Sequence, residues 1–222
     1  MEVAAKTEDK EKLQQIINLL RKEHSDAGIT LRHGNPLELL VATMLSAQST
    51  DKQINKVTRD LFQKYRTAAD YAEADLKELE TDVKSTGFYH NKAKHLKKTG
   101  QMLVEKFDSE VPRTMRELTM LPGVARKTAN IVLSKAFGRV EGIAVDTHVK
   151  RLAQRLGLTN NKNPDKIEKD LMMLVPKKDW PELTDLLIFH GRRVCAARNP
   201  NCRVCVVNKL CPSAFTFGAR KA

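Results

Sequence analysis

Residues 112–138 read PRTMRELTMLPGVARKTANIVLSKAFG, and this stretch decides the fold. Its pattern predicts a first helix that ends near Met120, a tight turn at 121–124 and a second helix over 125–137. Gly138 stands where a glycine commonly closes a helix in the left-handed conformation. The stretch therefore predicts two helices joined by a hairpin.

The glycine of this hairpin gives the turn a possible chemical use. A residue without a side chain lets the backbone approach a phosphate closely, and the N–H groups at the start of the next helix can hold that phosphate. Such contacts reach only phosphates and carry no sequence preference. A plain helical turn is an equal alternative for this feature alone. The residues expected at a phosphate contact are Leu121, Gly123, Ala125 and Arg126.

Lys127 follows Arg126 in the first turn of the second predicted helix. The positive end of the helix and the neighbouring guanidinium both disfavour the ammonium form of this lysine. A neutral amine is the form that attacks carbon, so the position favours a lysine nucleophile. The alternative is an exposed or phosphate-contacting lysine, as most lysines of a basic protein are. The sequence predicts Lys127 as a candidate catalytic residue.

Asp146 is the second candidate catalytic residue. It precedes an apolar helical stripe that ends at Gly157, so its side chain is expected to cap that helix. Capping alone would explain the residue, but a capping carboxylate can also face a cleft. His148 is expected to be structural, although a histidine so close could tune the site. The stripe consists of Val149, Leu152, Ala153 and Leu156.

The four cysteines lie near the C-terminal end of the chain with the spacing C-x6-C-x2-C-x5-C. A disulfide framework would suit a secreted protein, but no apolar signal region precedes the charged stretch 6–12. Structural zinc usually shows two C-x2-C pairs separated by a longer loop. A single short run favours a [4Fe-4S] cluster, in which each iron takes one thiolate, and zinc is the alternative. The predicted ligands are Cys195, Cys202, Cys205 and Cys211.

The charge of the chain indicates a polyanionic partner. Lys and Arg number 39 against 27 Asp and Glu, which gives a net charge of +12 and a pI near 9.6. These basic residues are spread along the chain, so they predict a folded surface that faces nucleic acid. One Trp, three Tyr and seven Phe leave few stacking platforms for a single-strand binder. No apolar run approaches the roughly 18 residues that span a membrane, which predicts a soluble protein.

Helical periodicity extends over nearly the whole chain, and alternating patterns typical of strands are almost absent. We therefore predict an all-α protein of about ten helices. Apolar residues recur at helical spacing at Leu13, Ile16, Ile17 and Leu20, and again at Ile54, Val57, Leu61, Phe62 and Tyr65. Further helices are predicted over 91–106, 112–118, 163–174 and 179–193. Prolines stand near predicted helix starts, where they are tolerated, at Pro36, Pro112 and Pro181.

Together these motifs resemble the endonuclease III family of base-excision DNA glycosylases. The resemblance rests on residues 121–130, on residues 145–148 and on the cysteine run, in that order along the chain. The stretches LSAQSTD at 45–51 and GFYHNKA at 87–93 are similar to the two DNA-probing loops of the family. The likeness extends from about residue 10 to residue 211 and so covers nearly all of the chain.

The resemblance implies a two-lobed helix-hairpin-helix DNA glycosylase fold. Residues 29–139 would form a six-helix barrel domain that carries the hairpin motif at 112–138. Residues 1–28 and 140–222 would form a second domain, with a [4Fe-4S] cluster in the loop 195–211. Double-stranded DNA would cross the cleft between the two lobes.

The resemblance also implies the chemistry, in which an oxidised pyrimidine such as thymine glycol is flipped out of the duplex. The amine of Lys127, on one wall of the cleft, would displace the base, form a Schiff base with the sugar and then nick the strand. Asp146, on the other wall, would stabilise positive charge on the sugar or help to deprotonate the amine. Gln48 would fill the gap left by the flipped base, and Phe88 would act as a wedge on the opposite strand. His148 completes the expected DNA contacts.

The chain departs from the family at Ala125, where members usually carry glycine. We expect a weaker or slightly shifted phosphate contact there, with activity retained. Lys127 and the short segment after Cys211 argue against the related adenine glycosylases, which lack this lysine. A DNA-binding scaffold without chemistry is the other alternative. The expected protein is a monomer in the cytoplasm of a prokaryote, associated with the nucleoid and not with a membrane.

Overall fold

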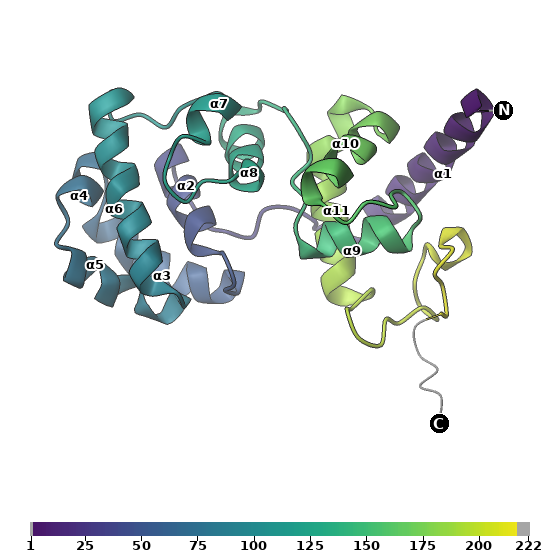
Figure 1. Ribbon diagram of the computed structural model, residues 1–222. Helices are drawn as coiled ribbons and strands as arrows, with labels where there is room; N and C mark the ends of the chain where they lie inside the picture. Colours follow the sequence, from purple (N-terminus) through teal and green to yellow (C-terminus); the bar gives the residue numbers. More distant parts are fainter. Residues whose placement is uncertain (1, 217–222) are drawn as a thin grey trace. The chain divides into compact units, whose positions relative to one another are not determined.

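The computed structural model describes residues 2–216, with side chains from Lys10 onward, and every regular element in this part of the chain is helical (Figure 1). The all-α prediction is therefore confirmed. The chain divides into two compact units. One is Thr30–Glu141, and the other joins the first 29 residues to the chain from Gly142 onward. Within residues 2–216, no helix has the length and the apolar character needed to cross a bilayer.

The unit Thr30–Glu141 is built around a buried helix. Its elements are α2 (Pro36–Leu45), α3 (Asp51–Lys64), α4 (Ala68–Glu73), α5 (Leu76–Val83), the 3₁₀ turn η1 (Lys84–Thr86), α6 (Tyr89–Lys106), α7 (Met115–Leu118) and α8 (Arg126–Phe137). All residues of α2 from Leu39 to Leu45 are buried, as expected for a helix that other helices surround. α2 packs along α8, and α6 packs along α4 and α5.

Side-chain caps and close packing explain where these helices begin and meet. A side-chain oxygen accepts a hydrogen bond from a backbone N–H of the first turn at Thr50, Thr67 and Asp75. Pro36 stands in the first turn of α2, as predicted. α6 approaches α4 so closely at Gly100 that a Cβ there would lie 2.7 Å from the carbonyl oxygen of Ala68. The glycine is therefore needed for the packing of these two helices.

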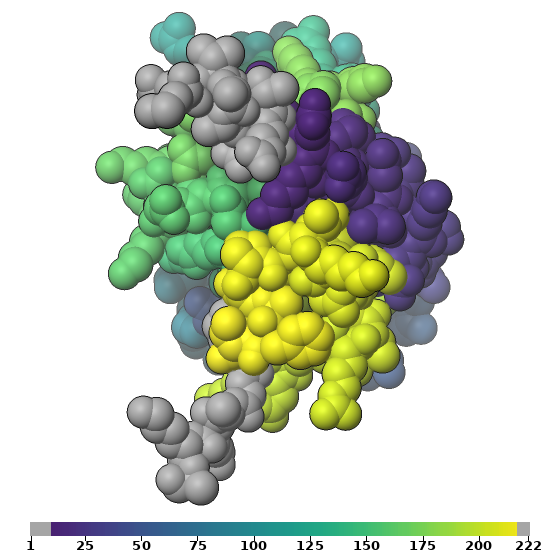
Figure 2. All heavy atoms as spheres, turned by 90° about the vertical axis from the view of Figure 1, so that its right-hand side faces the viewer, coloured from purple at the N-terminus to yellow at the C-terminus, as the bar shows by residue number. Residues whose placement is uncertain are grey.

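The other unit joins the beginning of the chain to its end. Its elements are α1 (Glu2–Glu23), α9 (Thr147–Arg155), α10 (Pro164–Leu174), η2 (Lys177–Asp179), α11 (Trp180–Arg193) and η3 (Asn208–Leu210). α11 packs against both α9 and α1. The predicted stripe of α1 is buried, with an exposed fraction of at most 1% at Leu13, Ile16, Ile17 and Leu20. Figure 2 shows the C-terminal segment, in yellow, against the N-terminal helix, in purple.

One predicted helix start in the hairpin region is wrong, and a second is one residue too early. The helix predicted over 112–118 begins three residues later, because Thr114 offers a side-chain cap, whereas Val111, which would precede a helix that starts at Pro112, has none. Its Oγ1 accepts a hydrogen bond from the backbone N–H of Glu117 at 3.3 Å. Ala125 is the N-cap of α8 and not its first helical residue. The other predicted helix ranges agree with the structure within two residues at each end.

Candidate functional site

The hairpin between α7 and α8 is anchored by two buried side chains with a glycine between them. Leu121 and Val124 are 2% and 5% exposed, and the backbone N–H of Val124 donates to the carbonyl oxygen of Leu121 at 3.1 Å. Gly123 has a φ of 80°, a conformation that favours glycine. Because the side chain of Leu121 is buried, only its backbone can take part in a phosphate contact.

Helix α6 supports the hairpin, a contact that the sequence analysis did not find. A Cβ at Gly123 would lie 2.7 Å from Nδ1 of His95. Glycine is therefore needed here for two reasons: the positive φ, and the close packing of the hairpin against His95. Thr99, one turn further along α6, donates from Oγ1 to the carbonyl oxygen of Pro122 at 3.1 Å. The i, i+4 spacing of His95 and Thr99 is the only signal in the sequence, and it says nothing about which segment these residues contact.

Lys127 lies where the sequence predicted it, in the first turn of α8, and its side chain is exposed. The N-cap residue Ala125 makes no side-chain hydrogen bond to the first N–H groups of α8, which is the arrangement that binds anions at helix starts. With φ −86° and ψ 168°, Ala125 has an extended backbone that any L-residue adopts. The methyl group of Ala125 therefore causes no backbone strain.

The two loops predicted to probe a partner share an unusual backbone conformation. Gln48 follows α2 and has a φ of 56°, while Phe88 precedes α6 and has a φ of 51°. Left-handed backbone is uncommon in residues other than glycine and is a reason to examine a site for function. Both side chains are exposed, that of Phe88 to 64%. At this exposure Phe88 is not a core residue.

Asp146 caps α9, as predicted. Its Oδ1 accepts hydrogen bonds from the backbone N–H groups of His148 and Val149, both at 2.8 Å. The residue is partly exposed, so the same carboxyl group can also meet a ligand. Lys127 belongs to the unit Thr30–Glu141 and Asp146 to the other unit, so their meeting at one cleft stays a prediction.

His148 is held by an arginine that the sequence analysis did not single out. Nη2 of Arg151 lies 3.1 Å from Nδ1 of His148, and because a guanidinium can only donate, Nδ1 is the acceptor. Burial lowers the pKa of His148, while the nearby charge of Asp146 acts in the opposite direction. Nη2 of Arg151 also donates to the carbonyl oxygens of Gly191 and Cys195, at 2.9 and 3.0 Å. These contacts agree with the structural role expected for His148.

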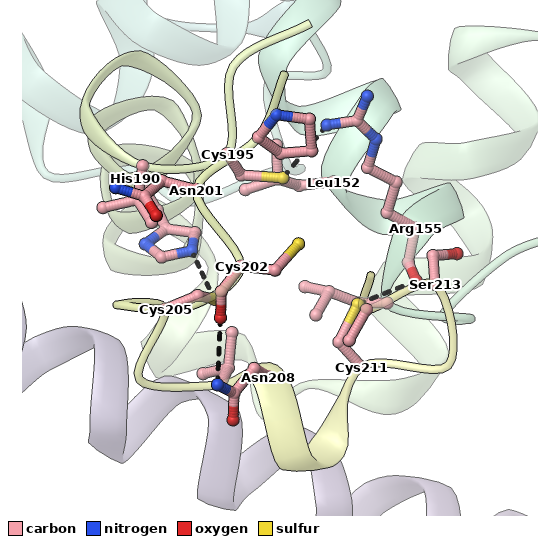
Figure 3. A pocket seen from close by; sticks show the side chains of 15 residues that line it. Leu152, Arg155, His190, Cys195, Asn201, Cys202, Cys205, Asn208, Cys211 and Ser213 are labelled. Atoms are coloured by element: carbon pink, nitrogen blue, oxygen red, sulfur yellow. Dashed lines mark hydrogen bonds between the residues drawn. The ribbon is translucent and has the colours of Figure 1, made fainter. Parts of the chain in front are cut away.

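The four cysteines line one pocket, and Figure 3 shows their side chains around a common space. None of the four is in a disulfide bond, which contradicts the disulfide alternative. The apolar part of the wall includes Leu152, Leu156 and Val207. Burial raises the pKa of the Cys205 and Cys211 thiols. A positive metal centre reverses that preference, because it binds the thiolate form.

Polar contacts reach the sulfurs from α9 and α11. Nη1 of Arg155 donates to Sγ of Cys195 at 3.2 Å and to the carbonyl oxygen of Ala196 at 2.8 Å. Nε2 of His190 lies 3.3 Å from Sγ of Cys205 (Figure 3). Arg155 follows Arg151 by one helical turn, so α9 presents two guanidinium groups to the cysteine segment. This spacing is the signal by which the sequence could have revealed them.

The arrangement of the cysteines bears on the kind of metal centre they could hold. Among the described residues, no three His, Cys, Asp or Glu side chains come close enough together to hold a single metal ion. Four sulfurs that face one pocket without converging on one point suit a polynuclear centre, in which each iron takes its own thiolate. The residues present therefore fit an iron–sulfur cluster.

Comparisons with known proteins agree with one another. A family model described as "HhH-GPD superfamily base excision DNA repair protein" matches residues 41–177, which is more than half of the chain. A protein named endonuclease III from Synechocystis sp. is 52% identical over 205 residues, which cover 92% of this chain and 94% of that protein.

Two solved structures are similar to this chain over nearly its whole length. One is a non-covalent endonuclease III–DNA complex, and the other is a trapped endonuclease III–DNA covalent intermediate. Each aligns with a TM-score of 0.89 and 46% sequence identity, and the alignment covers 93% of this chain and 97% of the other.

Proposed function

Because the chain belongs to the endonuclease III family of HhH-GPD base excision DNA repair proteins, we propose that it removes oxidised pyrimidines such as thymine glycol from duplex DNA, with Lys127 as the nucleophile. Membership of this family makes the chain a DNA glycosylase and AP lyase. One observation carries this assignment. Lys127 is an exposed amine in the first turn of the helix that directly follows the Gly123 hairpin. An amine in this place would stand beside the phosphate that the hairpin holds.

The reaction begins when Nζ of Lys127 attacks C1′ of the flipped nucleotide. The bond between C1′ and the base breaks, and the base leaves with the electron pair and takes up a proton. The amine then loses a proton, the C1′–O4′ bond opens, and O4′ is protonated, which leaves an iminium between Nζ and C1′. Removal of a C2′ proton supplies the electrons that break the C3′–O bond and expel the 3′ phosphate. Water hydrolyses the iminium and returns the free amine.

Asp146 would supply negative charge where the sugar becomes positive. As the bond to the base breaks, C1′ and O4′ share a developing positive charge, and a fixed carboxylate next to them lowers the barrier. The cap geometry supports this role, because two backbone N–H groups fix the direction of the carboxyl group without occupying both oxygens. The same carboxylate could accept the proton that the amine of Lys127 releases.

Gln48 and Phe88 would hold the duplex open during the reaction. Both are exposed and lie at the tips of short loops of the unit that carries Lys127. The amide of Gln48 can replace the lost base pair of the flipped nucleotide, and the ring of Phe88 can enter the stack on the opposite strand. The duplex then needs less energy to keep one base outside, which favours damaged bases that already stack poorly.

Duplex affinity is expected to fall steeply with salt. If six to ten phosphates are contacted, binding weakens by about 10³ to 10⁵ between 50 and 200 mM salt, because each neutralised phosphate releases counterions. Fluorescence anisotropy of a labelled duplex with a non-cleavable abasic analogue measures this slope. A shallow slope, equivalent to one or two phosphates, would contradict a broad basic interface and would leave the charge of the chain without a function.

Borohydride trapping tests the proposed function directly. The protein is mixed with a duplex that bears one thymine glycol, and borohydride reduces any iminium to a stable covalent product. We expect a protein–DNA band and a nicked strand in the same reaction. Base release without a band would indicate a monofunctional glycosylase that resembles the mismatch enzymes. Tight binding with neither product would indicate a DNA-binding protein without chemistry.

The four cysteines are proposed to bind a [4Fe-4S] cluster, which would supply a rigid anchor for the segment and no catalytic group. The segment that it would hold is basic and carries Arg198, Arg203 and Lys209. A segment that is already ordered loses less conformational entropy when it binds phosphates. Arg193 has a different role, because it pairs with Asp26 at 2.6 Å and its guanidinium lies over the ring of Phe189. That arginine anchors the end of α11 within its unit.

Metal analysis is expected to find four iron and four acid-labile sulfide per chain, as the proposed [4Fe-4S] centre requires. Replacing Cys205 with serine should lower both together, because serine is a poor ligand for iron in such clusters. Ser213→Ala is the matched control, since Ser213 lines the same pocket but is not a proposed ligand. One zinc per chain and no sulfide would reverse the assignment.

The enzyme is proposed to act as a monomer on the bacterial nucleoid. Its substrate is double-stranded DNA, and the relative from Synechocystis sp. is bacterial. A C2 dimer would need a self-complementary surface, whereas the net charge of +12 opposes the association of two copies.

A further inference from the structure

Lys92 is a buried lysine that the chemistry above does not use. It lies near the start of α6, and only 8% of its surface is exposed. Its Nζ donates to the carbonyl oxygen of Leu45 at 2.8 Å and to that of Thr86 at 2.7 Å. Burial lowers the pKa of this lysine. Lysine is among the residues that proteins bury least, so a lysine in this position needs a reason.

The two carbonyl groups belong to the last residues of the two elements that precede the exposed loops. Leu45 is the last residue of α2, and the loop with Gln48 follows it. Thr86 is the last residue of η1, and Phe88 follows after one glycine. Carbonyl groups at the end of a helix have no partner within that helix. The amine of Lys92 therefore satisfies the ends of both elements at once.

A second contact, near the surface, joins η1 to the helix that follows the first loop. The first loop leads directly into α3, and Nε2 of Gln53 in α3 donates to Oγ of Ser85 in η1 at 2.7 Å. α3 also packs against η1. The loop with Gln48 and the loop with Phe88 are therefore neighbours within one unit. Lys92 provides the buried contact between them, and the contact of Gln53 with Ser85 is exposed.

We propose that Lys92 is a positioning residue that fixes these two loops relative to each other, so that Gln48 and Phe88 reach one damaged base pair together. This inference rests on the DNA-probing roles proposed above for these two side chains. Without the amine, two buried carbonyl groups lose their donor, and both loops gain freedom. Loops that must be ordered during binding reduce the affinity for the lesion. The hairpin holds Lys127 independently, so the chemical step should be preserved.

The experiment compares Lys92→Met with Lys97→Met in the full-length protein. Methionine replaces the aliphatic part of lysine with a chain of similar shape but has no N–H donor. Lys97 is the matched control because it lies on the same helix and its Nζ donates to the carbonyl oxygen of Ala74 at 2.7 Å, which belongs to neither loop. Amide hydrogen exchange of residues 46–50 and 86–89 is measured in the free protein. Binding is measured on a duplex with an abasic analogue and on an undamaged duplex.

Lys92→Met is expected to accelerate exchange in both loops by about tenfold, the change that corresponds to a loss of roughly 1.4 kcal/mol. The preference for the abasic duplex over the undamaged one should fall by a similar factor. The single-turnover rate of strand cleavage at saturating enzyme should stay within about twofold of the wild type, because Lys127 is unchanged. Lys97→Met should change neither the exchange of the loops nor the preference.

Three outcomes would overturn the proposal: normal exchange in either loop, equal effects in both variants, or a loss confined to the saturated cleavage rate. A wild type without preference for the abasic duplex would instead overturn the roles of Gln48 and Phe88, and the exchange data would still decide the role of Lys92. If Lys92→Met does not fold, Lys92→Gln is used in the same measurements, because its amide keeps a polar group in the buried site but is one atom too short to reach both carbonyl groups. Exchange at the wild-type rate in both of its loops would then reject the proposal.

Discussion

Replacing Lys127 with alanine is expected to abolish covalent trapping and strand nicking while duplex binding remains nearly unchanged. Nicking should fall by at least about 10³-fold, because no other group replaces an amine that forms the bond to C1′. Stability should be preserved. The side chain is exposed in the first turn of α8, and alanine has the highest helix propensity. Gel analysis of borohydride reactions on a thymine glycol duplex measures both products.

A charge-matched variant is needed to interpret this result. Lys98→Ala removes one positive charge from an exposed position on α6 and leaves α8 intact. It should lower affinity slightly and leave the trapped band at the wild-type level. If Lys127→Ala still gives the band, another amine forms the iminium, and the assignment of the nucleophile is wrong. If both variants lose the band equally, the loss reflects charge and not the nucleophile.

The sequence was informative where a few neighbouring residues determine the structure. Gly123 needs a positive φ, Asp146 precedes an apolar stripe that a cap must begin, and the four cysteines follow each other closely. Each of these features depends on the local chain alone. The predicted helix-hairpin-helix glycosylase fold is likewise confirmed by the likeness to solved structures. The wrong start of α7 also has a local cause. Thr114 can cap a helix with its side chain, whereas a helix that starts at Pro112 would have no side-chain cap.

The contacts that support the site could not be predicted in the same way. His95 and Thr99 lie more than 20 residues before the hairpin that they contact, and Arg151 reaches the carbonyl oxygen of Cys195 from 44 positions away. A buried lysine such as Lys92 looks like any other lysine in a chain with 39 basic residues. Such contacts depend on how helices pack, which periodicity does not specify.

Helix α9 connects the two features that the sequence did reveal in its unit. Asp146 stands at its start, while Arg151 and Arg155 donate to the cysteine segment further along. The carbonyl and thiol groups of that segment are therefore held by the same helix that begins with the candidate carboxylate. A metal centre that fixes the segment would also fix α9. Loss of the centre should then disturb catalysis through the position of Asp146, without any chemistry at the cluster.

Asp146→Asn is expected to reduce turnover by about 10²- to 10⁴-fold while the protein stays as stable as the wild type. The amide keeps an oxygen that accepts from the N–H groups of His148 and Val149, and asparagine caps a helix about as well as aspartate. It removes only the negative charge and the ability to accept a proton. Multiple-turnover release of the damaged base, measured beside thermal unfolding, gives both quantities for one preparation.

Asp146→Ala separates the cap from the charge. It removes both, so it should lose activity as Asp146→Asn does and should also lose about 1 kcal/mol of stability from the missing cap. Equal stability of the two variants would mean that the cap contributes nothing measurable. Wild-type turnover in Asp146→Asn would be the more serious result. It would mean that the carboxyl group serves only to begin α9, and that the positive charge on the sugar is stabilised by another group. Because the two variants differ in the cap and agree in the missing charge, they assign each effect to one property of the same side chain.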